Sequence, residues 1–288
     1  MELKFTKMQG CGNDYIYINC FETHVDAPEK LAAILADRHY GIGGDGIVLI
    51  MPSTIADAKM RMFNSDGSEG KMCGNAIRCV AKYLYAKGIV TKETMAIETL
   101  SGTKKLRLNI INGEVVSVQV DMGKPILRPD MIPVNLPGEQ VVGRSVTIGG
   151  KDYKITCVSM GNPHCVVFCD EIETLDLTEI GPLFENHPLF PDRVNTEFVK
   201  MLSKNHLQMR VWERGSGETL ACGTGACASV VAAVLCGITE KDVEVKVSLR
   251  GGDLFVCYTD QGVLMTGDCH KVFDGMIHLA GTTIDESW

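Results

Sequence analysis

The chain has 288 residues, of which 45% are hydrophobic and 22% charged, and its net charge is −8. This length suits two domains or one large one, and the composition is enough to bury a core. The charge is spread along the chain, which argues against a nucleic-acid or anionic-membrane partner, and no apolar run reaches the roughly 18 residues that a membrane helix needs. The first residues also lack the apolar stretch of a secretory signal, so we expect a cytoplasmic protein.

The first part of the chain predicts strands around one long helix. Helices are expected at 31–38 and 73–87, the second ended by Gly88 as its C-cap, and a glycine-rich loop is expected at 41–46. Asn112 and Gly113 predict a hairpin turn. The strands are expected at 3–7, 15–20, 47–51, 59–64, 94–99, 103–111 and 114–121.

The second part repeats this order. A loop is expected around Gly181–Pro191, and a helix at 222–235 is followed by Gly237. This helix has small apolar residues on every face, which predicts burial all round, whereas helix 73–87 carries Arg78 and Lys82 on one side. The strands are expected at 152–159, 164–169, 196–201, 207–212, 243–249, 253–258 and 262–268, with a strand pair or turn at about 271–280.

A duplicated motif supports two similar halves. Glu69 precedes Cys73-Gly74 by the same spacing as Glu218 precedes Cys222-Gly223, and the two cysteines are 149 positions apart (222 − 73 = 149). The same offset relates other pairs without a gap from about residue 12 to residue 80.

The predicted fold class is α+β, with two pseudo-symmetric α/β half-domains. Each half is a mostly antiparallel, barrel-like sheet around a central helix, and we expect the active site in the cleft between the halves. The expected boundaries are 1–121 plus 274–288 for the half with Cys73, and 122–273 for the half with Cys222.

The chain has twelve cysteines but no Cys-x-x-Cys pair, so the spacing of a structural zinc site is missing and no metal is expected. Most of these cysteines lie in apolar stretches and are expected to pack as small hydrophobic residues; examples are Cys157, Cys165, Cys236 and Cys257. No glycine-rich dinucleotide or phosphate loop is present, so no cofactor is expected.

Cys73 and Cys222 are different because each opens a helix. The unpaired N–H groups and partial positive charge of a helix N-terminus lower the pKa of a thiol and can also bind a carboxylate. We therefore expect a thiolate on one side of a substrate α-carbon to remove its proton, while the opposite thiol delivers one. The helix dipoles would stabilise the charge that develops on the carboxylate.

Six motifs along essentially the whole chain make the sequence resemble the diaminopimelate epimerase family. They are Gly12-Asn-Asp-Tyr15, Phe63-Asn-Ser-Asp-Gly-Ser-Glu69, Met72-Cys-Gly-Asn-Ala-Ile-Arg78, Gly161-Asn-Pro-His164, Val194-Asn-Thr-Glu197 and Trp212-Glu-Arg-Gly-Ser-Gly-Glu218 with Ala221-Cys-Gly-Thr-Gly225. The family works without a cofactor and interconverts LL- and meso-diaminopimelate for lysine and peptidoglycan synthesis. It often forms dimers, which makes a homodimer the expected assembly.

The resemblance implies a role for each matching residue. Cys73 and Cys222 would be base and acid, Glu213 would meet the reacting ammonium group, and His164 would support proton transfer. The N–H groups that hold the reacting carboxylate would come from Gly74, Asn75, Gly223 and Thr224. The rest of the substrate would be held by Asn13, Asn64, Asn162, Asn195 and Arg214.

One departure and three alternatives remain open. Many family members have Asp-Gln where this chain has Asp45-Gly46, so a contact with substrate made by that glutamine is missing. A proline racemase-like enzyme or a hydroxyproline epimerase would share the two-cysteine logic, but typically carries Cys-Gly-His where this chain has Cys73-Gly74-Asn75. A thiol redox switch or binding homologue would use the same cysteines without epimerisation.

Overall fold

The structure of the protein is a computed structural model that describes residues 2–279. Within these residues the chain forms two compact units, 2–120 with 267–279 and 121–266. The predicted boundary lay after residue 273, whereas β18 (His270–His278) pairs with β1 (Glu2–Gly10) from end to end and so belongs with the first unit. The predicted first half also included 280–288, which lie outside the described residues.

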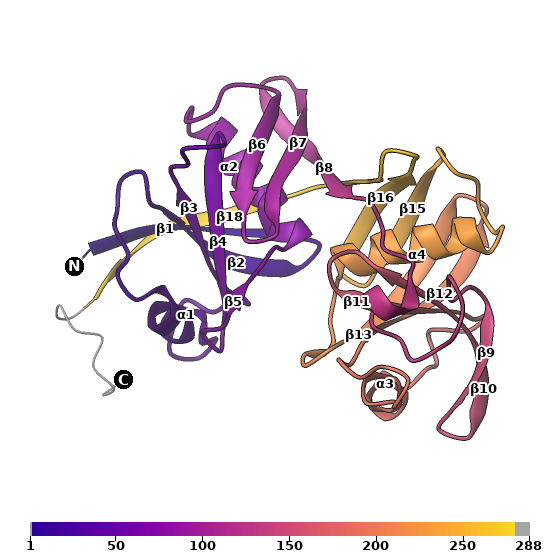
Figure 1. Cartoon of the computed structure of the whole chain (residues 1–288). Helices are drawn as coiled ribbons and strands as arrows, with labels where there is room; N and C mark the ends of the chain where they lie inside the picture. The colour runs from indigo at the N-terminus through magenta and orange to yellow at the C-terminus, as the bar shows by residue number, and fades with distance from the viewer. Residues whose placement is uncertain (1, 280–288) are drawn as a thin grey trace. The chain divides into compact units, whose positions relative to one another are not determined.

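The first unit is a mixed, mostly antiparallel sheet in the order β18-β1-β2-β3-β4-β6-β7-β8 (Figure 1). The β2–β3 and β4–β6 pairs are parallel, and β5 extends the β4 hairpin. The remaining strands are β2 (Asn13–Asn19), β3 (Gly46–Met51), β4 (Ala58–Asn64), β5 (Glu69–Gly70), β6 (Thr94–Thr99), β7 (Gly102–Ile111) and β8 (Glu114–Gly123).

The second unit repeats this pattern in the order β9-β10-β11-β12-β13-β15-β16, with β11–β12 and β13–β15 parallel. The pairings from β1 to β7 therefore recur from β10 to β16, which confirms the duplicated fold. The strands are β9 (Arg144–Ile148), β10 (Lys151–Ser159), β11 (Pro163–Phe168), β12 (Asn195–Ser203), β13 (His206–Glu213), β14 (Gly217–Glu218), β15 (Glu244–Leu249), β16 (Gly252–Tyr258) and β17 (Val263–Gly267). A short 3-10 helix covers Pro129–Met131.

Each sheet curves around one central helix. Helix α2 (Gly74–Ala86) contacts β1, β2 and β7, and α4 (Gly223–Leu235) contacts β10, β11, β12 and β16. Both helices end before a glycine with positive φ, Gly88 at 67° and Gly237 at 70°, as the C-cap pattern predicts. A second helix packs on the sheet in each unit, α1 (Pro28–Ala36) on β2, β3 and β4, and α3 (Leu177–Glu185) on β12, β13 and β14.

Helix α3 corrects the predicted loop around Gly181–Pro191, because it continues through Gly181 and Pro182 to Glu185. Asp176 caps its N-terminus by accepting from the Thr178 N–H at 2.9 Å. Pro182 suggested a break in this segment. The helix nevertheless continues through Pro182 and ends three residues later, at Glu185.

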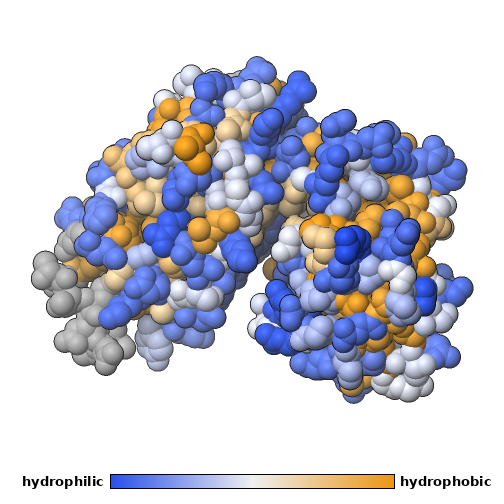
Figure 2. Space-filling model, viewed as in Figure 1, coloured by the Kyte–Doolittle hydropathy of each residue, from blue (hydrophilic) through white to orange (hydrophobic). Residues whose placement is uncertain are grey.

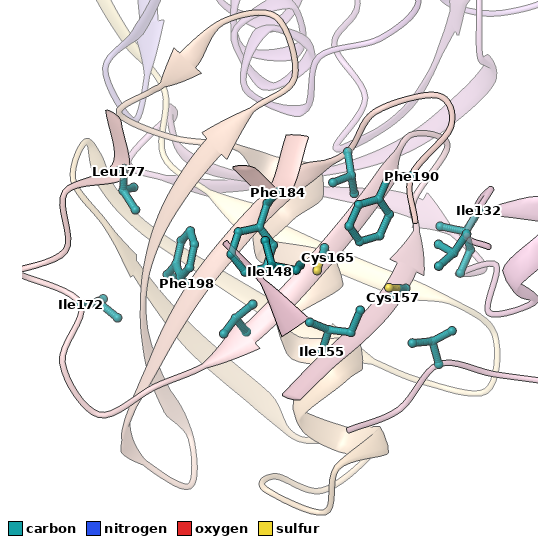
Figure 3. Packing of buried hydrophobic residues seen from close by; sticks show 14 residues of the cluster. Ile132, Ile148, Ile155, Cys157, Cys165, Ile172, Leu177, Phe184, Phe190 and Phe198 are labelled. Atoms are coloured by element: carbon teal, nitrogen blue, oxygen red, sulfur yellow. The ribbon is translucent and has the colours of Figure 1, made fainter. Parts of the chain in front are cut away.

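The core of the second unit contains two of the cysteines expected to pack as hydrophobic residues. Cys157 and Cys165 are almost fully buried in a cluster with Phe184 and Phe198, as Figure 3 shows. Cys236 corrects this expectation because it is exposed at the C-cap of α4. The cluster also includes Ile132, Val134, Val141, Ile148, Ile155, Val167, Ile172, Leu177, Phe190 and Val194.

The surface of α2 differs from the predicted amphipathic helix. Arg78 is fully buried, and its guanidinium donates to the carbonyl oxygens of Gly74 at 3.0 Å and Asp268 at 3.1 Å. Lys82 donates to the carbonyls of Val115 and Cys269. Both cations therefore bind backbone within the first unit. Helix α4 is buried nearly all round, as predicted.

On the face shown in Figure 2, hydrophilic residues separate the hydrophobic ones into groups. None of the helices in the described range 2–279 has the length and apolar composition to cross a membrane.

Candidate functional site

Cys73 is the N-cap of α2. Its backbone is extended (φ −130°, ψ 121°), and its sulfur accepts from the Ala76 N–H at 3.5 Å. The half-buried side chain donates to Asn13 Oδ1 at 3.2 Å. The Nδ2 of Asn13 in turn donates to Asp45 Oδ2 at 2.6 Å, which fixes the orientation of this amide. The structure therefore brings Asn13 and Cys73 together in the first unit.

The other predicted residues of the first unit lie on the elements next to Cys73. Gly74 and Asn75 form the first turn of α2 and are buried. The Oδ1 of Asn75 is buried without a hydrogen-bond partner among the described residues. Asn64 ends β4, and its Nδ2 donates to Ser68 Oγ at 3.0 Å.

Cys222 is the N-cap of α4 with nearly the same backbone (φ −123°, ψ 108°), and its sulfur accepts from the Gly225 N–H at 3.4 Å. It lies 3.5 Å from Thr224 Oγ1. Unlike Cys73, this side chain is buried, and burial together with the Glu213 and Glu197 carboxylates raises its pKa well above the usual value. The expected lowering by the helix N-terminus is therefore outweighed at Cys222, where the Gly225 N–H and Thr224 oppose the rise only in part.

Glu213, the last residue of β13, lies beside Cys222. It accepts from the Thr219 hydroxyl, and burial raises the pKa of its carboxyl, while Thr219 and Cys222 act in the opposite direction. Thr219 was not identified from the sequence, and Asp45 was noted only as the neighbour of Gly46, because each acts through another side chain.

A chain of side-chain contacts surrounds Cys222. His164 and Glu197 are fully buried, and His164 Nδ1 lies 2.7 Å from Glu197 Oε1. His164 Nε2 lies 3.0 Å from Asn162 Oδ1, and Asn162 Nδ2 donates to Thr224 Oγ1 at 3.3 Å. Sequence reasoning placed His164 and Asn162 in the site but missed Glu197, although the predicted strand 196–201 would have aligned it with the strand of His164.

Asn195 and Arg214 lie together at the ends of β12 and β13. Asn195 Oδ1 accepts from the backbone N–H of Arg214 at 2.8 Å. The Arg214 guanidinium donates to the carbonyl oxygen of Asp192 at 2.8 Å. The backbone of Arg214 is thus held by the side chain of Asn195, and its half-buried side chain is held by the backbone at Asp192.

The duplicated glutamates form a matched ion pair in each unit. Arg61 donates to Glu69 at 2.7 and 3.0 Å, and Arg210 donates to Glu218 at 2.8 and 3.1 Å. Each pair closes a hairpin, β4–β5 or β13–β14, whose last strand leads into the cysteine. The spacing that the sequence repeats therefore corresponds to a bidentate contact that holds the approach to each helix.

Among residues 2–279, one group could hold a metal ion, formed by His164, Glu197 and Cys222 with ligand atoms within 4.8 Å of one another. The 2.7 Å between His164 Nδ1 and Glu197 Oε1 is a hydrogen-bond distance. Two ligands of one tetrahedral zinc ion stand about 3.3 Å apart or more, given metal–ligand bonds of about 2.0 Å. This arrangement therefore fits a hydrogen bond between the two side chains better than a pair of metal ligands.

Comparison with known proteins agrees with this geometry. A model of the family described as diaminopimelate epimerase matches residues 5–127 and 156–272. A diaminopimelate epimerase of Acetivibrio thermocellus is 54% identical over 279 residues, covering 96% of this chain and 99% of the relative. One of Methanococcus maripaludis is 51% identical over 279 residues, covering 96% of this chain and all of the relative.

The fold also occurs in solved structures of much lower identity. A probable proline racemase from Agrobacterium radiobacter has a TM-score of 0.69 at 14% identity, covering 96% of this chain and 93% of that one. A hydroxyproline epimerase from Agrobacterium vitis has a TM-score of 0.66 at 14% identity, covering 98% and 94%. These two resemble the chain in fold alone, whereas the family model and the high identities show that the chain belongs to the diaminopimelate epimerase family.

Proposed function

We propose that the chain interconverts LL- and meso-diaminopimelate by a two-base proton transfer at the α-carbon, with Cys73 and Cys222 as the acid–base pair. As a member of its family, the chain is an isomerase that acts as an epimerase. The observation that carries the two-base proposal is the matched pair of N-cap cysteines, each with its sulfur accepting an N–H from the first turn of its helix.

The proton transfer needs one thiolate and one thiol. In one direction the Cys73 thiolate removes the α-proton, and the Cys222 thiol gives its proton to the opposite face of the same carbon. Cys73 then holds the proton and Cys222 is the thiolate, ready for the reverse direction. The raised pKa of Cys222 suits the acid role, because it keeps this sulfur protonated near neutral pH.

The remaining residues would hold the substrate. The N–H groups at Gly74 and Asn75, and at Gly223 and Thr224, would bind the reacting carboxylate, because helix N-termini carry unpaired donors and partial positive charge. Glu213 would accept from the reacting ammonium group.

The distal end of the substrate carries a second amino acid group. Arg214 would pair with its carboxylate. The asparagines that would sort its remaining donors and acceptors are Asn13, Asn64, Asn162 and Asn195. We further propose a cytoplasmic homodimer acting in lysine and peptidoglycan precursor synthesis, on the strength of the family.

The test is wash-in of solvent deuterium at the α-carbon of LL-diaminopimelate, followed by mass spectrometry under reducing conditions. We expect the wild type to incorporate deuterium as meso-diaminopimelate forms. Cys73→Ala and Cys222→Ala should each lose epimerisation by about 10³-fold, within the range for a removed general acid or base.

Cys236→Ser is the matched control because Cys236 is exposed and lies at the other end of α4. The epimerase activity of this variant should stay at the wild-type level. Proline serves as the control substrate with a single carboxylate and should not exchange. The epimerase proposal fails if the wild type incorporates no deuterium. The two-base assignment fails if either alanine variant keeps full epimerisation.

A further inference from the structure

Glu197 is a fully buried carboxylate that lies near the N-terminal end of α4, where Cys222 is the N-cap. In the parallel β11–β12 pair, His164 lies opposite Asn195, two residues before Glu197, so His164 and Glu197 share one face of the sheet. Helix α4 packs on these strands (Figure 1). A side chain at Gly225 would meet Glu197 Oε1 at 2.6 Å, so the absence of a Cβ there lets this carboxylate approach the first turn of the helix.

The hydrogen bonds that lead from His164 to Cys222 all have the same direction, because each group donates to the next one. Both ring nitrogens of His164 face oxygens, Glu197 Oε1 at 2.7 Å and Asn162 Oδ1 at 3.0 Å, so the nitrogen that faces the amide oxygen is placed to donate to it. With its oxygen occupied, Asn162 donates from Nδ2 to Thr224 Oγ1 at 3.3 Å. The Thr224 hydroxyl, having accepted this bond, has its proton left for Cys222 Sγ at 3.5 Å.

We propose that Glu197 is a positioning residue that, through His164 and Asn162, turns the Thr224 hydroxyl to donate to the sulfur of Cys222. The donated bond stabilises the thiolate that Cys222 becomes each time it gives up its proton. This inference rests on the proposed function, since it assigns the chain of contacts to the turnover of Cys222 as acid and base.

The first unit shows the opposite arrangement. Asp45 accepts from Asn13 Nδ2, so Asn13 presents its oxygen to Cys73 and receives a bond from the thiol. Asn13 and Asn162 occupy matched positions in the two repeats. Asn13 accepts a hydrogen bond from Cys73, whereas Asn162 bonds to Thr224, the donor at Cys222. The series of contacts from Glu197 therefore leads to Cys222.

The decisive experiment compares Thr224→Val with Thr224→Ser in pH profiles of kcat/KM measured in both reaction directions. Both variants keep the backbone N–H at residue 224, but only serine keeps a hydroxyl. In the direction that begins with the Cys222 thiolate, we expect the acid limb of Thr224→Val to move up by about one pH unit, a loss of about tenfold on that limb. Thr224→Ser should keep the wild-type limb.

The opposite direction is the internal control, because its acid limb reports the Cys73 thiolate and should not move in either variant. Glu197→Gln provides the second test. Because the Glu197 carboxylate also raises the pKa of Cys222, Glu197→Gln is made both in the wild type and in Thr224→Val, where only the loss of that charge can act. We expect Glu197→Gln to lower the acid limb further in the Thr224→Val background than in the wild type, where the lost hydrogen bond to the thiolate opposes the effect, with folding checked by circular dichroism. An equal shift in both backgrounds would contradict the role of Glu197.

Equal pH profiles for Thr224→Val and Thr224→Ser would overturn the inference. Equal shifts of the acid limb of Thr224→Val in both reaction directions would also overturn it. If Glu197→Gln does not fold, the Thr224 pair decides alone. Cys222→Ala distinguishes a failure of the proposed function from a failure of the role given to Glu197. Full epimerisation in Cys222→Ala defeats the proposed function itself, whereas an inactive Cys222→Ala with unshifted Thr224→Val profiles defeats only the role of Glu197.

Discussion

Asp14 shows how a single charged residue can support the loop that carries Asn13. Its carboxylate pairs with the buried Lys7 at 2.6 Å and with Arg38 at 2.7 Å. Burial alone would raise the pKa of Asp14, but the contacts with Arg38 and Lys7 outweigh it and hold the pKa below the usual value. The neighbouring Asp45 also accepts from Arg38, at 3.0 Å, so the two acids share one cation.

We predict that Asp14→Asn destabilises the first unit by about 3 kcal/mol at pH 7, because it leaves Lys7 buried without its carboxylate. A lowered pKa contributes stability above the unfolded value of about 3.9, and this stability is lost as the pH falls through the folded value. The gap between variant and wild type should therefore narrow below about pH 4. Thermal unfolding from pH 7 to pH 3 measures it, with the exposed Asp130→Asn as control, and a gap that is constant with pH contradicts the account.

Residue identities alone predicted most residues of the candidate site but not the hydrogen bonds that connect them. The cysteines, His164 and Asn162 could be identified because they belong to repeated or recognisable motifs. Glu197 and Arg78 also end recognised motifs, but their burial could not be predicted, since charged residues are expected at the surface and only their partners justify burying them. The pKa of Cys222 was misjudged for a related reason, because the effect of a helix N-terminus is local whereas desolvation depends on the whole unit.

At the scale of elements, the 149-residue repeat was more informative than local propensity. It maps both ends of α1, Pro28 and Ala36, onto the ends of α3, Leu177 and Glu185, so the repeat contained the signal for the helix that we predicted as a loop. Gly181 and Pro182 suggested a break there. No strand was predicted at β9 or at the two-residue strands β5 and β14. The other strands and the helices α2 and α4 were predicted to within a few residues, because their patterns are strong and tertiary contacts reinforce them.

Gly181 is required by packing, since a Cβ there would stand 2.2 Å from Cδ2 of Trp212. We predict that Gly181→Ala lowers the free energy of unfolding by about 2 kcal/mol, although alanine favours helices by about 1 kcal/mol. Glu179→Ala, on the exposed side of the same helix, should change it by less than about 0.5 kcal/mol. Urea denaturation compares the two, and a stabilised Gly181→Ala would show that α3 does not pack on Trp212 in this way.

The duplicated Arg–Glu pairs give a prediction that compares the two units. The Arg210–Glu218 side chains are 13% and 15% exposed, whereas those of Arg61 and Glu69 are 32% and 27% exposed. Arg210 also donates to backbone before α3, at the carbonyls of Ile172 and Leu175. We therefore expect Glu218→Gln to lower the melting temperature more than Glu69→Gln.

Both variants should also reduce kcat, because each pair holds the hairpin that leads into a cysteine. Steady-state kinetics with scanning calorimetry measures the two effects together. Equal melting temperatures for the two variants would count against the difference in burial, and an unchanged kcat in both would show that the hairpins do not position the cysteines.

At the scale of the whole molecule, two copies of one fold have kept the cysteine and its helix while the surrounding residues diverged. Cys73 is half-buried and donates to an amide oxygen, whereas Cys222 is buried beside two carboxylates. A reaction that runs both ways at one carbon needs both sulfurs, and an unsymmetrical pose of the substrate needs different neighbours. The central claim is that these two sulfurs serve a single carbon.

The most direct measurement of that claim is oxidative crosslinking in the absence of substrate. We treat the enzyme with oxidised glutathione, map disulfides by mass spectrometry, and follow epimerase activity before and after a thiol reductant. The account predicts that a Cys73–Cys222 disulfide forms, that activity falls in proportion to it, and that both effects are reversed by reduction and persist in Cys236→Ser. Full activity in protein shown to carry the Cys73–Cys222 crosslink would contradict the account.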